Sequence, residues 1–166
     1  MKQPAPIAFA PTALAQERLG APRRAELTGC PWHDVKAKLR GVGLRPTRQR
    51  MALGWMLFAK GDRHVTAEML YEEANRAKVP VSLATVYNTL HQFTEAGLLR
   101  EVAVEGAKTY FDTNTSNHYH FFCEHTGQLM DIETGAIRIE GLPEAPDGMA
   151  ISRVDVLVRL VDKSIS

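Results

Sequence analysis

The sequence of 166 residues predicts an α+β protein, in which an N-terminal winged helix-turn-helix domain precedes a small α/β dimerisation domain. Three observations indicate this order. Capped helical patterns follow one another up to Gly97, two alternating runs around a Glu-Gly turn come next, and short strand-like runs fill the remainder. Helices followed by a hairpin are the elements of a winged helix-turn-helix.

The chain divides where its composition changes. Residues 1–28 mix Pro, Ala and Gly without sustained periodicity, so we expect a mobile arm. The polar run NTSN at 114–117 is the expected joint, which gives a DNA-binding domain over 29–113 and a second domain over 117–166. Because the second domain is too small for a comfortable core of its own, we expect it to complete that core in a homodimer.

Two helices are expected before residue 61. The first lies in PWHDVKAKLR, with Pro31 at its first position, Cys30 at its N-cap and Gly41 just past its end. The second lies in TRQRMALGWMLFAK, is capped by Thr47 and stops at Gly61. Its apolar face is expected to comprise Met51, Trp55 and Phe58.

Two further helices follow. Thr66 caps the helix in HVTAEMLYEEANRAK, and Val65 and Leu70 stand at the positions of a hydrophobic staple. Ser82 caps the helix in VSLATVYNTLHQFTEAG, which ends at Gly97. The buried stripe of this last helix is expected to comprise Leu83, Val86, Leu90 and Phe93.

The rest of the chain is expected to be mostly β. A hairpin is predicted in LLREVAVEGAKTYFDT, and a strand, a turn and a strand in HYHFFCEHTGQLMDI. One more long strand is expected in MAISRVDVLVRLV, at 149–161. The Pro-rich run GLPEAPDG leaves room between them for one short helix at most.

Charge is distributed unevenly along the chain. Residues 1–50 hold ten Lys and Arg against three Asp and Glu, whereas residues 100–166 hold six against eleven. This asymmetry favours a polyanion as partner of the first half, although a dipolar surface without a partner is an alternative. No apolar run is long enough to span a membrane, and prolines interrupt the start of the chain, so we expect a cytoplasmic protein.

The fourth helix has the properties of a recognition helix. Small polar side chains on its outward face can approach base edges, while the buried stripe fixes its angle. The arginines of LRPTRQR are placed to contact phosphates. An ordinary helical domain with a solvated arginine face is the alternative. The predicted DNA contacts are Arg45, Arg48, Arg50, Ser82, Thr85, Tyr87 and Asn88.

A second group of residues has the chemistry of a metal site. His118 and His120 are two positions apart on a predicted strand, so both rings point to one face. Histidines combined with carboxylates suit iron, manganese or zinc. Two unrelated histidines on a surface strand are the alternative. The predicted ligands are His64, Glu105, His118, His120 and Asp131.

An enzyme would also use histidines and carboxylates. The sequence, however, contains no HExxH helix, no nucleophile elbow and no phosphate-binding glycine loop. We therefore expect a regulator and no catalytic residues.

Five motifs resemble those of the ferric uptake regulator (Fur) family and occur in the same order: GLRPTRQR, HVTAEMLY, LATVYNTLHQFTEAGLL, VEGAKTYF and NHYHFFCEHTGQLMDI. The resemblance runs from about Leu39 to Val161. With GCPWHD ahead of it, the chain is most similar to the iron-response-regulator (Irr) branch of alpha-proteobacteria. The resemblance implies a dimeric regulator, mainly a repressor, of haem biosynthesis and iron homeostasis genes, which is active when iron is scarce and inactivated by haem.

The resemblance also implies ligands and partners. The five predicted metal ligands match the family's interdomain regulatory site, and haem, operator DNA and a haem-delivering biosynthetic enzyme are the implied partners. Haem is expected at Cys30 and His33. Pro31 keeps the Cys30 thiol at the positive end of a helix, and the apolar ring of Trp32 can pack against the porphyrin. His118 and His120 are further candidate haem ligands, since HYH keeps the outer two of the three histidines of this branch.

Three departures from the family pattern limit these expectations. Thr126 replaces the second cysteine of a CxxC, so a thiolate zinc site cannot form and Cys123 is expected to be a buried apolar residue. Tyr119 and Arg138 occupy positions where a second metal site needs ligands. The alternative function is therefore a Fur-type regulator that responds directly to Fe, Mn or Zn without haem.

Overall fold

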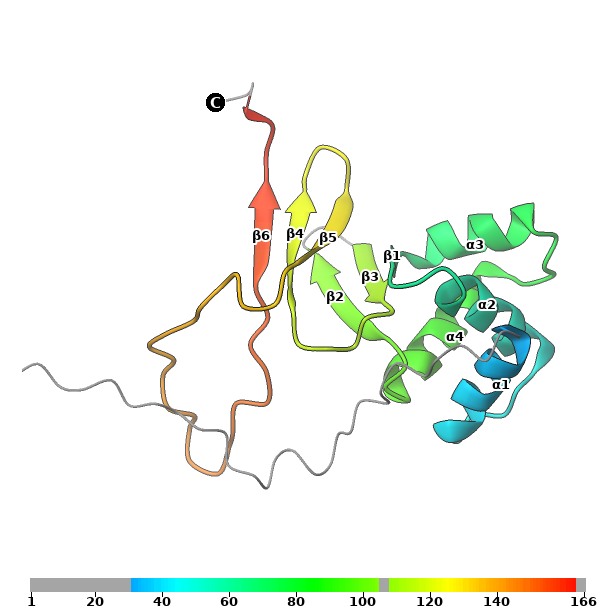
Figure 1. Cartoon of the computed structure of the whole chain (residues 1–166), viewed down its shortest axis with the longest axis horizontal. Helices are drawn as coiled ribbons and strands as arrows, with labels where there is room; N and C mark the ends of the chain where they lie inside the picture. The colour runs from blue at the N-terminus through cyan, green and yellow to red at the C-terminus, as the bar shows by residue number, and fades with distance from the viewer. Residues whose placement is uncertain (1–30, 105–107, 164–166) are drawn as a thin grey trace, which may run out of the picture.

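The computed structural model describes residues 31–104 and 108–163, and within them two units lie side by side (Figure 1). The first unit packs helices against a three-stranded sheet, and the second is built on a separate three-stranded sheet. The helices are α1 (Pro31–Gly41), α2 (Arg48–Phe58), α3 (Ala67–Arg76) and α4 (Leu83–Glu95). The strands are β1 (His64–Val65), β2 (Arg100–Val104), β3 (Lys108–Asp112), β4 (Tyr119–Cys123), β5 (Gln128–Ile132) and β6 (Leu157–Leu160).

The predicted caps of α2, α3 and α4 are confirmed. The hydroxyl oxygens of Thr47, Thr66 and Ser82 each accept a backbone N–H three residues further on, at distances of 3.3, 3.3 and 3.1 Å. Each cap satisfies a donor that has no partner inside its helix and stabilises the helix by about 1 kcal/mol. These local signals explain why the starts of the helices could be predicted closely.

The apolar face of α2 differs from the prediction at Trp55. This side chain is 37% exposed, and the buried residues of the helix are Met51, Leu53, Gly54 and Leu57. The cause is the crossing with α1, because a Cβ at Gly54 would lie only 2.8 Å from Cγ1 of Val35. Gly54 therefore allows α1 and α2 to approach closely, which turns Trp55 outward.

The core of the first unit contains the predicted residues of α3 and α4. Val65 and Leu70 of the staple are completely buried, as are Val86, Leu90 and Phe93 of the α4 stripe. Leu83 is only half-buried at the start of the helix. This shared core holds α4 at a fixed angle to the other helices and leaves its outer face exposed.

The first sheet has the strand order β1-β3-β2, and all of its pairs are antiparallel. The predicted hairpin is confirmed by the β2–β3 pairing from Arg100 opposite Asp112 to Val104 opposite Lys108. The short strand β1 was not predicted from the sequence. It pairs with the end of β3 and places His64 opposite Asp112.

The second sheet has the strand order β5-β4-β6, with β4 antiparallel to β5 and parallel to β6. The strand, turn and strand predicted over 118–132 are confirmed. The long strand predicted over 149–161 is wrong in extent, because only Leu157–Leu160 is strand. Met149 and Ile151 are 72% and 50% exposed, so among the described residues the alternating pattern before β6 has no strand or core to pack against. Between β5 and β6 the described chain contains no helix.

Arg100 connects the two units. Its side chain is 8% exposed, and one guanidinium nitrogen donates to the carbonyl oxygens of Ser116 and His118, at 3.2 Å each. The other forms an ion pair with Asp155, just before β6. A buried guanidinium with these partners holds β2, the joint and the start of β6 together. Among the described residues, no helix is long and apolar enough to cross a membrane.

Candidate metal centre and nucleic-acid interface

Two cross-strand pairs, one in each sheet, bring the candidate metal ligands together. His64 lies opposite Asp112 in the first sheet, and His120 lies opposite Asp131 in the second. His118 precedes β4 and projects to the same face as His120, because alternate residues of an extended chain share a face. One ligand atom from each of these five residues lies within 4.8 Å of the others.

Each carboxylate lies within 3.6 Å of all three imidazoles. Oδ2 of Asp112 lies 2.9 Å from Nε2 of His118, 3.3 Å from that of His120 and 3.6 Å from that of His64. Oδ1 of Asp131 lies 2.8 Å from His64, 3.2 Å from His118 and 3.6 Å from His120, measured to the same ring nitrogen. All five atoms therefore surround one small volume.

Burial and charge make this volume favour a cation. Asp112 is completely buried, and the side chains of His118 and His120 are 3% exposed. Burial opposes ionisation of Asp112, but hydrogen bonds from His120, His64 and the backbone N–H of Asn114 hold the pKa of its carboxyl well below its usual range. Burial likewise opposes protonation of His64, but the nearby carboxylates of Asp112 and Asp131 raise its pKa.

The donor set fits a transition-metal ion better than internal hydrogen bonding. Nε2 of His64 is buried without a hydrogen-bond partner, although Asp131 lies close to it. Nε2 of His118 and Nε2 of His120 face each other at 2.9 Å. Nδ1 of His118 lies 2.9 Å from the carbonyl oxygen of Ser116, and a hydrogen bond from this nitrogen leaves a lone pair on Nε2. Three imidazole nitrogens and two carboxylate oxygens suit zinc, iron or manganese.

Sequence reasoning found four of these five residues: His64, His118, His120 and Asp131. The fifth predicted ligand, Glu105, lies outside the described residues. Asp112 was missed because its position opposite His64 depends on β1, a strand too short to predict. One signal was present in the sequence: KTYFD ends a predicted strand with an acidic residue, directly after two aromatic residues.

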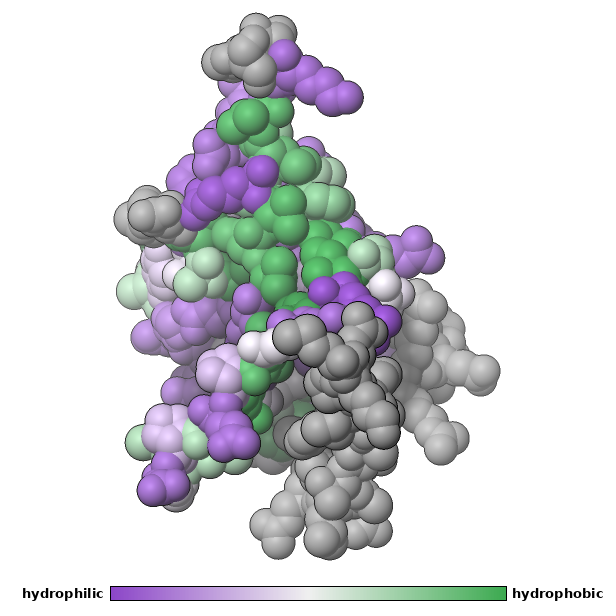
Figure 2. Space-filling model, turned by 90° about the vertical axis from the view of Figure 1, so that its left-hand side faces the viewer, coloured by the Kyte–Doolittle hydropathy of each residue, from purple (hydrophilic) through white to green (hydrophobic). Residues whose placement is uncertain are grey.

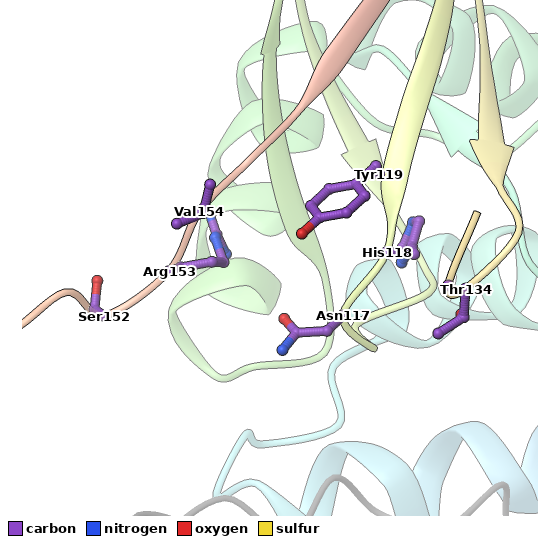
Figure 3. Close-up of a pocket in the computed structure, with 8 residues that line it drawn as sticks. Asn117, His118, Tyr119, Thr134, Ser152, Arg153 and Val154 are labelled. Atoms are coloured by element: carbon purple, nitrogen blue, oxygen red, sulfur yellow. The ribbon is translucent and has the colours of Figure 1, made fainter. Parts of the chain in front are cut away.

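His118 and His120, which were also predicted as haem ligands, are buried. Both Nε2 atoms lie among carboxylates and beneath the surface, so a porphyrin cannot approach them without opening the site. A polar hollow of about 290 Å³ does border His118, between the start of β4 and the segment that leads to β6 (Figure 3). Its lining comprises Asn117, His118, Tyr119, Thr134, Gly135, Ser152, Arg153 and Val154.

The predicted DNA-contacting residues lie on or next to α2 and α4. Tyr87 and Asn88 are exposed on α4, and the Tyr87 hydroxyl donates to Oε1 of Glu68 at 2.5 Å. This bond links the exposed face of α4 to α3. Ser82 and Thr85 lie at the start of α4, where their hydroxyl oxygens are 2.9 Å apart.

Arg50 differs from the other two arginines of the predicted set. Arg45 and Arg48 are exposed and remain available for phosphates. The guanidinium of Arg50 instead donates to Oε1 of Gln92, at 3.1 and 2.8 Å, and to the carbonyl oxygen of Arg45 at 2.9 Å. Arg50 therefore fixes α4 against α2, and its role as a phosphate contact stays a prediction.

The predicted haem motif lies at the start of α1. Cys30 is outside the described residues, and His33 is exposed on the first turn of the helix. Beside it, an apolar hollow of about 390 Å³ is lined by Trp32, Ala52, Trp55 and Val79. Cys123, expected to be buried, is a half-exposed free thiol, and a hydrogen bond with Thr126 lowers its pKa.

A family model named ferric uptake regulator family matches residues 41–156, which is more than half of the chain. The chain belongs to the ferric uptake regulator family. The match includes all five residues of the metal centre and the whole of α2, α3 and α4. It agrees with the observed architecture, in which an N-terminal DNA-binding domain precedes a small α/β dimerisation domain.

Relatives within the Fur family were found by sequence and by structure. The peroxide-responsive repressor PerR of Staphylococcus aureus is 36% identical over 97 residues, which cover 58% of this chain and 65% of the relative. The chain thus spans less than two thirds of this curated relative. The ferric uptake regulator of Pseudomonas aeruginosa with manganese is 25% identical, with a TM-score of 0.59 over 78% of this chain and 98% of the other.

The ferric uptake regulator of Vibrio cholerae has a similar fold, with a TM-score of 0.61 over 76% of this chain and 98% of the other, at 22% identity. These Fur-family relatives are named as regulators and repressors. This agrees with the expectation from the sequence that the chain is not an enzyme.

Proposed function

We propose that the chain is a homodimeric transcription regulator whose binding to operator DNA depends on a divalent metal ion. One observation carries this proposal: the five-residue centre joins the two units. His64 and Asp112 come from the sheet of the helical unit, whereas His118, His120 and Asp131 come from the second unit. An ion held by both sets restricts the angle between the units. Metal binding would therefore fix the position of the DNA-binding surface relative to the second unit.

The residues of the centre have separate tasks. Asp112 and Asp131 supply negative charge, and the three histidines supply neutral nitrogen ligands that select a borderline metal over calcium or magnesium. Without an ion, the lone pairs of the imidazole nitrogens and carboxylate oxygens repel one another. A bound cation would attract all of them. Because four of the five side chains are mostly buried, the centre suits a regulatory ion more than one that must meet a substrate.

The DNA contacts follow from the outer surface of the helical unit. Ser82, Thr85, Tyr87 and Asn88 face outward at the beginning and middle of α4, where a recognition helix reaches base edges. Arg45 and Arg48 supply phosphate contacts before and at the start of α2. Two copies of this surface in a dimer would read two half-sites of an AT-rich operator.

We further propose that the chain is an Irr-like regulator of haem biosynthesis and iron homeostasis genes, active when iron is scarce and inactivated by haem. Cys30, with His33 as an alternate ligand, is the proposed haem site. The apolar hollow lined by Trp32 and Trp55 supports this proposal, because a porphyrin face is apolar and Trp32 follows the Cys-Pro dipeptide directly in the sequence. A haem-delivering enzyme of haem synthesis is the proposed further partner.

The alternative is a Fur-type regulator that responds directly to Fe, Mn or Zn without haem. The similarity to relatives named for manganese binding and for a peroxide response supports this alternative. The cytoplasm is the proposed location for either function.

Operator binding by the purified full chain tests these proposals. Fluorescence anisotropy with a promoter fragment is measured for the metal-free protein, after addition of Mn²⁺, and after addition of haem. We expect Mn²⁺ to change the operator affinity at least tenfold in the wild type and not in His118→Ala, whose ligand is lost. An affinity independent of metal in the wild type would contradict the regulatory role of the centre.

Haem separates the two finer functions. If the Irr-like proposal is right, haem abolishes operator binding by the wild type. The Cys30→Ala variant then still binds the operator in the presence of haem and lacks the thiolate-type Soret band of the wild type. If haem has no effect on the wild type while Mn²⁺ does, the direct metal response is supported. Cys123→Ala is the matched control, because this second thiol is distant in sequence and is expected to leave the haem response unchanged.

A further inference from the structure

Asn114, in the joint between the two units, hydrogen-bonds both carboxylates of the centre. Its backbone N–H donates to Oδ1 of Asp112 at 2.8 Å, and its side-chain Nδ2 donates to Oδ2 of Asp131 at 3.3 Å. These are the carboxylate oxygens that face away from the histidines, since Oδ2 of Asp112 and Oδ1 of Asp131 are the ones close to the imidazoles. One residue therefore holds the outer oxygen of each acidic ligand.

The amide of Asn114 is itself held in place. Its Oδ1 accepts hydrogen bonds from the backbone N–H of Ser116 at 3.2 Å and from the Ser116 hydroxyl at 2.6 Å. These contacts assign the oxygen and nitrogen of the amide, because only the nitrogen can donate to Asp131. The carbonyl of Ser116 in turn accepts from Nδ1 of His118 and from buried Arg100. The joint thus contacts three of the five candidate ligands.

The position of Asp131 gives this bond its importance. Asp131 is the most exposed member of the centre, with 36% of its side chain accessible, whereas Asp112 is completely buried. A carboxylate at the surface can rotate and present either one or both oxygens to a cation. The bond from Asn114 leaves only Oδ1 of Asp131 directed at the histidines.

From this arrangement we infer that Asn114 is a positioning residue of the metal centre, which restricts Asp131 to one ligand oxygen and links it to Asp112 across the two units. The inference rests on the proposed metal-dependent function and deepens it, because it names the group that sets ligand geometry. Residues that orient metal ligands typically contribute a factor of about 10 to 100 in metal affinity. We expect the centre to prefer ions that bind five ligand atoms. Larger ions, which often bind both oxygens of a carboxylate, are expected to bind more weakly.

The test measures Co²⁺ binding to the full chain in which Asn114 is changed to Ala or to Asp. Asn114→Ala removes the side-chain donor and leaves the backbone bond to Asp112, whereas Asn114→Asp keeps the acceptor for Ser116 and replaces the donor with a charged oxygen that repels Asp131. We expect both variants to bind Co²⁺ about 10 to 100 times more weakly than the wild type. We also expect their visible d–d absorption to weaken, because release of Asp131 allows a higher coordination number.

The control is Thr115→Ala, the exposed neighbour of Asn114, which is expected to retain wild-type affinity and spectrum. Unchanged affinity and spectrum in both Asn114 variants would overturn the inference and leave the proposed function intact. Equal losses in Thr115→Ala would also overturn it, since the effect would then belong to the loop as a whole. If the wild type binds no Co²⁺, the proposed function fails and the inference fails with it.

Discussion

The side chain of Arg63 fixes the strand that carries His64. Its guanidinium donates to both carboxylate oxygens of Glu73 on α3, and Nη1 also donates to the carbonyl oxygen of Met56 at 3.1 Å. Its backbone N–H donates to the Thr113 hydroxyl oxygen at 2.8 Å. The two-residue strand β1, which is too short to be stable alone, is thereby attached to a helix and to Thr113, directly before the joint.

The pH dependence of stability follows from this pair. The hydrogen bond from Arg63 holds the pKa of Glu73 below its usual value, so the pair stabilises the fold above the unfolded pKa of a glutamate and the effect is lost as the pH falls through the lower, folded pKa. We expect Glu73→Gln to lower the free energy of unfolding near neutral pH by about 1 kcal/mol or less. The difference from the wild type should disappear in acid.

Urea unfolding at several pH values measures this difference. Glu72→Gln is the control, because Glu72 is exposed and pairs with Arg76 on the same helix, at 3.8 Å. A Glu73→Gln difference that stayed constant down to acid pH would show that the charge of Glu73 is not the cause.

At the scale of elements, α4 is held against α2 by the polar contact of Arg50 with Gln92 as well as by the apolar core. Oε1 of Gln92 accepts from two nitrogens of the same guanidinium. The contact lies next to Arg48, which is on the same helix but exposed. Two neighbouring arginines of one sequence run therefore have different tasks, one within the fold and one toward solvent.

Substitution of each arginine separates these tasks. We expect Arg50→Ala to lower the free energy of unfolding by about 1–3 kcal/mol, since hydrogen bonds to a charged group are lost. We expect Arg48→Ala to leave stability unchanged but to weaken operator binding and to reduce the dependence of log K on log salt by about one. Thermal unfolding and anisotropy titrations at several salt concentrations measure both effects. An unchanged salt dependence in Arg48→Ala would exclude Arg48 as a phosphate contact.

At the scale of the whole molecule, the second unit has a small core and an exposed apolar face. The buried cluster that includes Leu129 of this unit is completed by Val104 and Tyr110 of the first sheet. Large apolar residues lie exposed before and after β6, and an apolar surface extends over this side of the molecule (Figure 2). The exposed large apolar residues between β5 and β6 and after β6 are Leu142, Met149, Ile151 and Val161.

This face is the expected contact between two copies of the chain. We expect the wild type to sediment as a dimer, and the double change of Met149→Glu and Ile151→Glu to shift it toward the monomer, because two charges would be buried in the contact. Sedimentation velocity over a range of concentrations measures the shift. Met69→Glu is the control, since Met69 on α3 is also exposed, at 43%, but lies in the helical unit. A double variant that remained dimeric would place the contact elsewhere.

What the sequence determined by itself was everything governed by short-range patterns. Helix starts at Thr47, Thr66 and Ser82, the buried stripe of α4 and the β2–β3 hairpin follow from caps, periodicity and a turn, all of which act within a few residues. The pairing of His118 with His120 on one face belongs to this class too, because the period of a strand is local.

Only the tertiary structure decided what depends on contacts between distant segments. The pairing of β1 with β3 brought Asp112 opposite His64, and the close approach of α1 at Gly54 turned Trp55 outward. The contact with Gln92 makes Arg50 a link between α2 and α4. Strand β6 is short because the apolar residues before it find no neighbouring strand. In each case the partner is far away in sequence, so no local pattern could specify the contact.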